Sequence, residues 1–158
     1  MATQKSIKLE EYTLYPFLIP SINLDFNISN DFVVVQALMM IKPKSNNYEK
    51  LILQGKQIKL ISIHIDGREI DSNEYIISDS ELIIYSPPLS EFKLKIISQI
   101  NPYNNTSLEG LYLSSGMLTT QCEAEGFRRI CYHPDRPDVL TKYKVRIEAD
   151  KFSFPILL

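Results

Sequence analysis

Alternating apolar and polar residues constrain the fold of this 158-residue chain more than any other feature. One segment places Ile22, Leu24, Phe26 and Ile28 on one face, with Asn and Asp residues between them. A period of two is typical of a half-buried β-strand. The other segments that we predict to be strands are residues 32–41, 51–53, 58–65, 75–77, 81–85, 92–96 and 143–147.

Turn signals separate these segments. Asp66-Gly67 is typical of a tight hairpin turn, and Pro87-Pro88 forces an extended break. No long amphipathic helical pattern is found, and the best helical candidate is a turn or two inside residues 123–129. The sequence therefore predicts an all-β fold, either an antiparallel β-sandwich or a saddle-shaped curved sheet, with at most a short helical turn near 123–129.

Size and charge narrow the class of protein. A chain of this length is expected to form a single domain with its own core. The net charge is −2, and Lys and Arg are dispersed, so we expect no nucleic-acid partner. No apolar run is long enough to span a bilayer and the N-terminus lacks a signal core, so we expect no membrane partner and a cytoplasmic location. In that compartment Cys122 and Cys131 are expected to stay reduced.

The segment TQCEAEGFR, residues 120–128, concentrates the polar chemistry. It holds an amide, Gln121, two carboxylates, Glu123 and Glu125, and the first of two arginines, Arg128 and Arg129. One interpretation is an ion-pair network that only fixes a loop. The other leaves one carboxylate unpaired to receive a cation, with the amide oxygen as a second acceptor for a substrate ammonium. The spacing does not choose between them.

A self-contained active site is not visible in the sequence. It has no HExxH, no nucleophile elbow and no phosphate-binding loop. His64 falls on the polar face of a predicted strand and is expected to be solvated, whereas His133 is expected in a loop near the motif. A metal enzyme using His64, His133, Cys122 and Cys131 is one alternative, although no ligand spacing supports it.

Several runs resemble the N-terminal β-domain of the zinc aminopeptidases of the aminopeptidase N (alanyl aminopeptidase) type. They are TQCEAEGFRRICYHPDRPDV, the preceding NTSLEGLY, the upstream LILQGKQIKLISIHIDG and the final IEADKFSFPILL. The resemblance covers all but about the first dozen residues. It implies a β-domain packed on a thermolysin-like catalytic domain, which holds zinc in the full-length parent. The family's GxMEN and HExxH motifs are absent here, so we expect the catalytic domain to be missing and the chain itself to bind no zinc.

The resemblance also implies roles for individual residues. Glu123 would bind the free α-ammonium of a peptide substrate, Gln121 would line the pocket for its first residue, and Met117 is assigned to the same pocket. Glu125, Arg128, Arg129, Asp135 and Asp138 are assigned to the architecture of the loop.

We expect three parts within the single domain: a polar leader at residues 1–14, a strand-rich body at 15–104, and a substrate-loop segment with closing strands at 105–158. The apolar finish FPILL suggests a fragment that continues into another domain. The main alternative is a non-catalytic β-sandwich binding module that shares only this loop.

Overall fold

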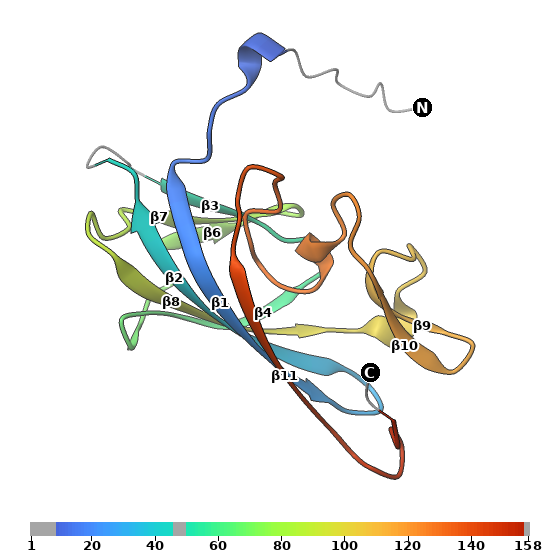
Figure 1. Ribbon diagram of the computed structural model, residues 1–158. Helices are drawn as coiled ribbons and strands as arrows, with labels where there is room; N and C mark the ends of the chain where they lie inside the picture. The colour runs from blue at the N-terminus through green and yellow to red at the C-terminus, as the bar shows by residue number, and fades with distance from the viewer. Residues whose placement is uncertain (1–8, 46–49, 157–158) are drawn as a thin grey trace.

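The computed structural model describes residues 9–45 and 50–156 and consists mainly of strands (Figure 1). Three sheets are present in the described ranges: one of six strands, one of three and one of two. The all-β prediction is confirmed. Most of the predicted leader, and the last two residues of the apolar finish, lie outside the described residues. None of the helices in the described ranges is long and apolar enough to cross a membrane.

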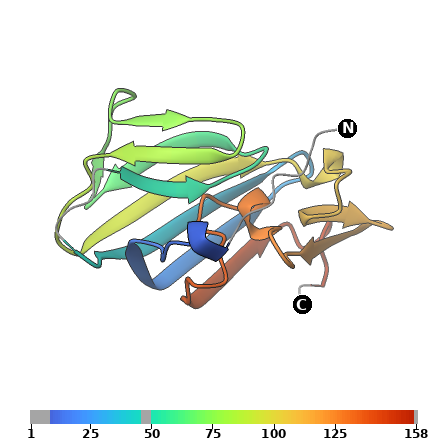
Figure 2. The same ribbon diagram turned by 90° about the horizontal axis from the view of Figure 1, so that it is seen from above.

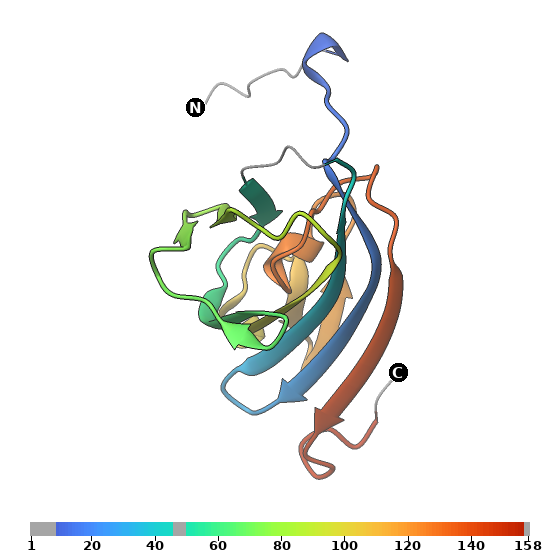
Figure 3. The ribbon, with the colours of Figure 1, turned by 90° about the vertical axis from the view of Figure 1, so that its left-hand side faces the viewer.

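The six-stranded sheet has the order β11-β1-β2-β8-β4-β5. Its strands are β1 (Phe17–Ile28), β2 (Val33–Pro43), β4 (Lys59–Ile65), β5 (Arg68–Glu69), β8 (Phe92–Ile100) and β11 (Lys142–Ala149). Figure 3 shows β1, β2 and β11 curving together, in agreement with the expected curved sheet.

The remaining elements are small. They are the three-stranded sheet of β3 (Lys50–Gln54), β7 (Glu81–Tyr85) and β6 (Tyr75–Ile77), the hairpin of β9 (Gly110–Ser114) and β10 (Met117–Gln121), and the 3₁₀ turns η1 (Leu9–Glu11), η2 (Pro102–Asn104) and η3 (Phe127–Arg129). The turn η3 lies where the sequence predicted helical structure.

One strand departs from the antiparallel prediction. β11 pairs with β1 in parallel, with Val145 beside Leu24. A parallel neighbour requires a long connection, because the chain must return to the same end of the sheet before it pairs. Residues 101–141 provide that return, and they carry the whole polar motif.

The alternation in β4 is also interrupted. The sequence predicted Ile61, Ile63 and Ile65 on one face, but the pairing of β4 with β8 shifts register between Leu60 and Ser62. This β-bulge turns Ile61 outward, where it is 51% exposed, while Ile63 stays buried. Periodicity alone does not show such an extra residue.

Two tight turns each consist of a polar residue and a glycine, both with positive φ. The predicted Asp66-Gly67 turn is confirmed, since both residues have positive φ (49° and 89°) between the paired Ile65 and Arg68. The second turn, at Ser115-Gly116, closes the β9–β10 hairpin with φ of 49° and 82°. The sequence analysis missed this hairpin, although a Ser-Gly dipeptide between two short apolar runs is the signal for it.

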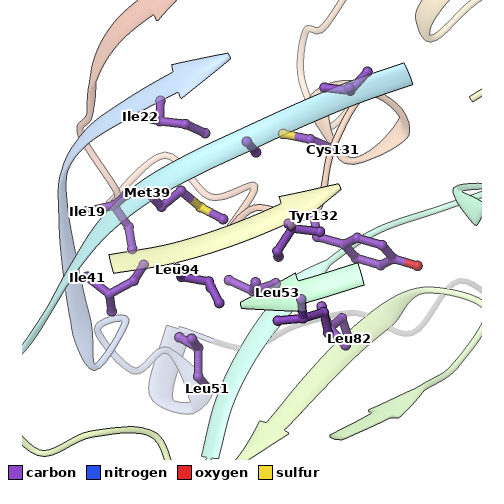
Figure 4. Packing of buried hydrophobic residues seen from close by; sticks show 14 of the residues in the cluster. Ile19, Ile22, Met39, Ile41, Leu51, Leu53, Leu82, Leu94, Cys131 and Tyr132 are labelled. Atoms are coloured by element: carbon purple, nitrogen blue, oxygen red, sulfur yellow. The ribbon is translucent and has the colours of Figure 1, made fainter. Parts of the chain in front are cut away.

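The core lies between the large sheet and the elements that cover its inner face (Figure 2). Leu51, Leu53 and Leu82 of the small sheet face Met39 and Leu94 of the large sheet (Figure 4), and all five are fully buried. Burying one such side chain contributes about 1.5–3 kcal/mol. Alternation in the long strands thus supplies one face of this core.

Residues 122–139, here called the strap, cover a further part of the inner face. Ile130, Cys131, Tyr132 and His133 are buried there. The strap joins β3 through two backbone hydrogen bonds, from Gln54 N to His133 O (2.9 Å) and from His133 N to Gln54 O (3.1 Å). The sequence analysis placed His133 in a loop, and the structure shows that this part of the loop belongs to the core.

The packing of Tyr132 depends on a glycine. A Cβ at Gly55 would lie 2.2 Å from two ring carbons of Tyr132. Real side-chain contacts are never that short, so the ring or the backbone would have to move.

We therefore expect Gly55→Ala to lower the free energy of unfolding by about 1–3 kcal/mol, the usual cost of overpacking a core. Urea denaturation measures this value. Gly67→Asn is the control, because nothing lies within 4 Å of a Cβ there and Asn tolerates a positive φ. A change below about 0.5 kcal/mol for Gly55→Ala would show that Tyr132 does not need the glycine.

His133 provides a second test of the strap. Both of its ring nitrogens are buried without a hydrogen-bond partner among the described residues, and the ring packs edge-on against Phe127 at 5.2 Å. Burial lowers the pKa of His133 to about 4, although the charge of Asp135 acts in the opposite direction.

Because an unfolded chain has an ordinary imidazole pKa near 6.5, the unfolded state takes up the proton first as pH falls. The contribution of His133 to stability is therefore complete above about pH 6.5 and is lost between pH 6.5 and 4, up to about 3 kcal/mol. We expect His133→Leu to remove this part of the pH dependence. The measurement is the difference in unfolding free energy between variant and parent at pH 7 and pH 4.5, and a constant difference would contradict the prediction.

Candidate functional site

The β9–β10 hairpin carries the start of the polar motif. It lies at the opposite end of the molecule from β3, β6 and β7 (Figures 1 and 2). Gln121 is the last residue of β10 and pairs with Gly110, the first residue of β9. The root of the hairpin, rather than its tip, therefore presents Gln121.

The Glu123 loop, residues 121–126, turns back tightly on this root. Gly126 N donates to Cys122 O at 2.9 Å, and the Glu123-Ala124 peptide bond is cis. A Cβ at Gly126 would lie 2.4 Å from Gln121 O, and a Cβ at Gly110 would lie 2.6 Å from the Cβ of Arg129. Two glycines thus allow the loop and the following η3 turn to lie directly on β9.

Both arginines after the loop have acidic partners. Arg128 Nε and its backbone N donate to Asp135 Oδ2 at 2.9 and 3.1 Å, and its Nη1 lies 3.2 Å from a carboxylate oxygen of Glu125. The buried Arg129 donates from Nε to Glu109 at 2.8 Å. These contacts use Glu125, Asp135 and Glu109 as counter-ions.

Glu123 remains different from its neighbours. Its side chain is exposed, and its carboxylate forms no ion pair with any residue of the described ranges. Gln121 is also exposed, and its Nε2 donates to the backbone carbonyl of Glu123 at 3.2 Å. This bond fixes the amide beside Glu123 and leaves the oxygen of Gln121 as an unused acceptor. A carboxylate and an amide oxygen side by side can accept N–H bonds from a cation.

Met117 lies farther away. It is the first residue of β10 and is 66% exposed. Four residues separate it from Gln121, about 13 Å along a strand at roughly 3.3 Å per residue, and both side chains point to the same face of the hairpin. The structure therefore places Met117 on the face of Gln121 but near the hairpin tip.

The PDRPD segment, residues 134–138, has a structural role. Asp138 binds Arg136 through two oxygens at 2.8 and 3.0 Å and accepts from Tyr15 N at 3.1 Å. Hydrogen bonds from Arg136 lower the pKa of Asp138 to about 2. This pair joins the strap to the start of β1.

The possible metal ligands do not assemble. No group of three or more His, Cys, Asp or Glu side chains that could hold a metal occurs among the described residues. His64 lies in β4 and is hydrogen-bonded to Ser62 Oγ at 3.1 Å, whereas His133 is enclosed by the strap. Among the described residues these side chains do not form a zinc ligand set, so the metal enzyme that would use all four is not supported.

The cysteines are equally unsuited to catalysis. Cys122 and Cys131 are both free, and Cys131 is fully buried. Burial raises the pKa of the Cys122 thiol, so the reactive thiolate is disfavoured.

Comparison with known proteins agrees with this geometry. Residues 10–156 match the family described as Peptidase M1 N-terminal domain. Aminopeptidase N of Caulobacter vibrioides is 43% identical over 156 residues, which make up 99% of this chain and 18% of that protein. This chain therefore spans less than a fifth of that relative's length.

Solved structures give the same result. Legionella pneumophila aminopeptidase A in complex with aspartic acid has a TM-score of 0.89 at 30% identity, covering 96% of this chain and 18% of that one. A mutant M1 zinc metallopeptidase of Deinococcus radiodurans, bound to a Tyr-Ser-Ala substrate, has a TM-score of 0.71 at 12% identity, covering 85% and 33%. The second likeness shows the fold alone. The resemblance inferred from the sequence is confirmed, and the chain belongs to the Peptidase M1 N-terminal domain family.

Proposed function

We propose that this chain is the N-terminal domain of a cytoplasmic zinc aminopeptidase, which removes N-terminal residues from peptides, and that Glu123 binds the α-ammonium group of the substrate. The observation that carries the proposal is the charge distribution around the loop. Glu125, Asp135 and Glu109 each pair with an arginine, whereas the exposed Glu123 does not.

An exopeptidase must recognise a charged N-terminus. A fixed carboxylate does so by Coulomb attraction, and each charge-assisted hydrogen bond contributes about 1.5–3 kcal/mol. In the proposal Gln121 Oε1 lines the pocket of the first substrate residue beside Glu123. Met117 would contact only a side chain that extends toward the hairpin tip.

The ligand of one relative supports this class of substrate. The Legionella protein was solved with aspartic acid, which carries a free α-amino group. An amine anchor on the present chain would serve the same kind of molecule.

The proposal assigns residues 1–158 to one domain, with the leader at 1–14, the body at 15–104 and the substrate-loop segment at 105–158. The zinc and the catalytic domain would belong to polypeptide beyond this domain, because the described residues do not fit a metal. The length of the Caulobacter relative, of which this chain covers 18%, leaves ample polypeptide for such a domain.

An uncovered apolar strip on β11 offers a place for that domain to dock. Tyr143, Val145 and Ile147 are paired with β1 residues on the core side of the large sheet, yet they are 50%, 53% and 41% exposed. Tyr143 packs edge-on against Phe127 at 5.7 Å, so the strip begins beside the Glu123 loop. A non-catalytic binding module would use the same strip for a separate partner, and this is the alternative function.

In the full-length protein, we expect Glu123→Gln to reduce kcat/KM for peptide substrates by about 2–4 kcal/mol, roughly 30- to 700-fold, the cost of removing one partner of a desolvated charge pair. Steady-state kinetics measure this loss. Glu125→Gln is the matched control, because Glu125 is also exposed but already pairs with Arg128, and it should change kcat/KM by less than about threefold. Unaltered kinetics for Glu123→Gln would remove the amine anchor from the proposal.

The docking strip predicts a separate effect. We expect Val145→Thr, which keeps the β-branched shape but adds a hydroxyl, to change the stability of the 158-residue chain by no more than about 0.5 kcal/mol. Its affinity for the separately produced remainder of the protein should fall about 5- to 30-fold, because the hydroxyl would be buried on docking. Calorimetric titration measures the affinity. Lys144→Thr, on the opposite face of β11, should not change it, and equal affinities for all three forms would place the docking surface elsewhere.

A further inference from the structure

A polar cavity lies at the junction of three segments that are far apart in the sequence. Its volume is about 250 Å³, and neither Gln121 nor Glu123 lines it. The polar residues that line it are Lys56, Gln57, Asn101, Asn104, Asn105 and Arg129. They come from the β3–β4 connection, the end of β8 with η2, and η3.

The side-chain acceptors of three of these residues are already in use. Gln57 Oε1 accepts from Arg129 Nη1. Asn101 Oδ1 accepts from two backbone N–H groups, those of Tyr103 and Asn104, each at 3.1 Å. Asn105 Oδ1 accepts from Ser107 N and Oγ at 3.1 and 2.7 Å.

Most of the side-chain donors around the cavity are left over. The exception is Asn105 Nδ2, which donates to the backbone carbonyls of Glu109 and Leu111 at 2.7 and 2.9 Å. Among the described residues that line the cavity, the side-chain nitrogens without a partner are Lys56 Nζ, Gln57 Nε2, Asn101 Nδ2, Asn104 Nδ2 and Arg129 Nη2, and Asn104 also keeps an unused Oδ1. Arg129 is the most informative, because its side chain is only 7% exposed. Its Nη2 is not among the polar atoms that are sealed from solvent without a partner, so a ligand in the cavity that Arg129 lines can accept a hydrogen bond from it.

The charge balance is also favourable for an anion. The carboxylate of Glu109, which contacts Arg129 Nε, neutralises the charge of Arg129. Lys56 therefore supplies a net positive charge at the cavity. Cations are poor ligands for a cavity that offers mainly N–H groups. Oxygens of an anion accept such groups, and hydrogen bonds to charged donors are the stronger kind.

We propose that this cavity binds a small oxyanion, a phosphate or a carboxylate, held by Arg129, Lys56 and the amides of Gln57 and Asn101. The ligand is either a free anion or an acidic side chain presented by other polypeptide, since both offer the same oxygens. The site is separate from the amine anchor and does not rest on the proposed peptidase function.

The test is a titration of the isotope-labelled 158-residue chain with inorganic phosphate and, separately, with succinate, followed by NMR at constant ionic strength. We expect saturable shifts of the amide signals of Lys56, Gln57 and Asn101, with a Kd of about 1 mM or tighter. Tighter binding of phosphate would indicate a free tetrahedral anion, and tighter binding of succinate a carboxylate. The absence of saturable shifts with both anions would overturn the proposal.

Two variants localise the binding without removing the buried arginine. Lys56→Gln should weaken binding about tenfold. Asn101→Asp keeps the oxygen that caps η2 but replaces the amide donor by a negatively charged oxygen. This variant should therefore lose more affinity for the anion than Lys56→Gln does. Lys59→Gln, close in sequence but outside the cavity, is the control and should retain the parent Kd. Unchanged Kd values for both Lys56→Gln and Asn101→Asp, in variants with the parent's thermal unfolding curve, would also overturn the proposal.

Discussion

The contact between Tyr132 and Gly55 is the one on which the rest of the structure depends. The ring occupies the space where any other residue would place a Cβ. The residues on either side of the glycine also hold the strap, since Gln54 exchanges two backbone hydrogen bonds with His133 and Lys56 N donates to Arg128 O at 2.8 Å. Gln54, the last residue of β3, and the two residues that follow it therefore fix the strap on the core. The exposed Glu123 loop is mounted on this rigid segment, which is how a surface loop keeps a defined geometry.

The arginines of the strap form ion pairs with residues that are not their neighbours in the sequence, so the local sequence does not show these pairs. Arg128 forms an ion pair with Asp135, seven residues later in the chain. Arg129 forms one with Glu109, twenty residues earlier. The structure contains the ion-pair network of the first interpretation and also one carboxylate outside that network. Glu125 joins the network and Glu123 does not. Because Arg128 and Arg129 already pair with the carboxylates of this network, they do not pair with Glu123.

Much of the fold could be predicted because alternation and turn chemistry are local. The bounds of β6 and β7 agree with the sequence, as does the Asp66-Gly67 turn. The failures are long-range in origin. The bulge at Ile61 arises from pairing with β8, the parallel position of β11 from the path of a long connection, and the burial of His133 from a bridge to Gln54. The family was accessible from the sequence, whereas the donors of the polar cavity become visible only when three distant segments meet.

The exposure of Glu123 and of the β11 strip have a common physical consequence. Two opposite charges 4 Å apart attract by only about 1 kcal/mol in water but by about 4 kcal/mol at the effective dielectric constant of a partly covered site. An amine anchor on an open loop is therefore weak until another surface excludes solvent from it. The apolar side chains of Tyr143, Val145 and Ile147 lie uncovered beside the segment that carries the loop. A domain that buried this strip would gain hydrophobic stabilisation and, at the same time, lower the dielectric constant around Glu123, so docking and substrate recognition would be coupled through the same covered surface.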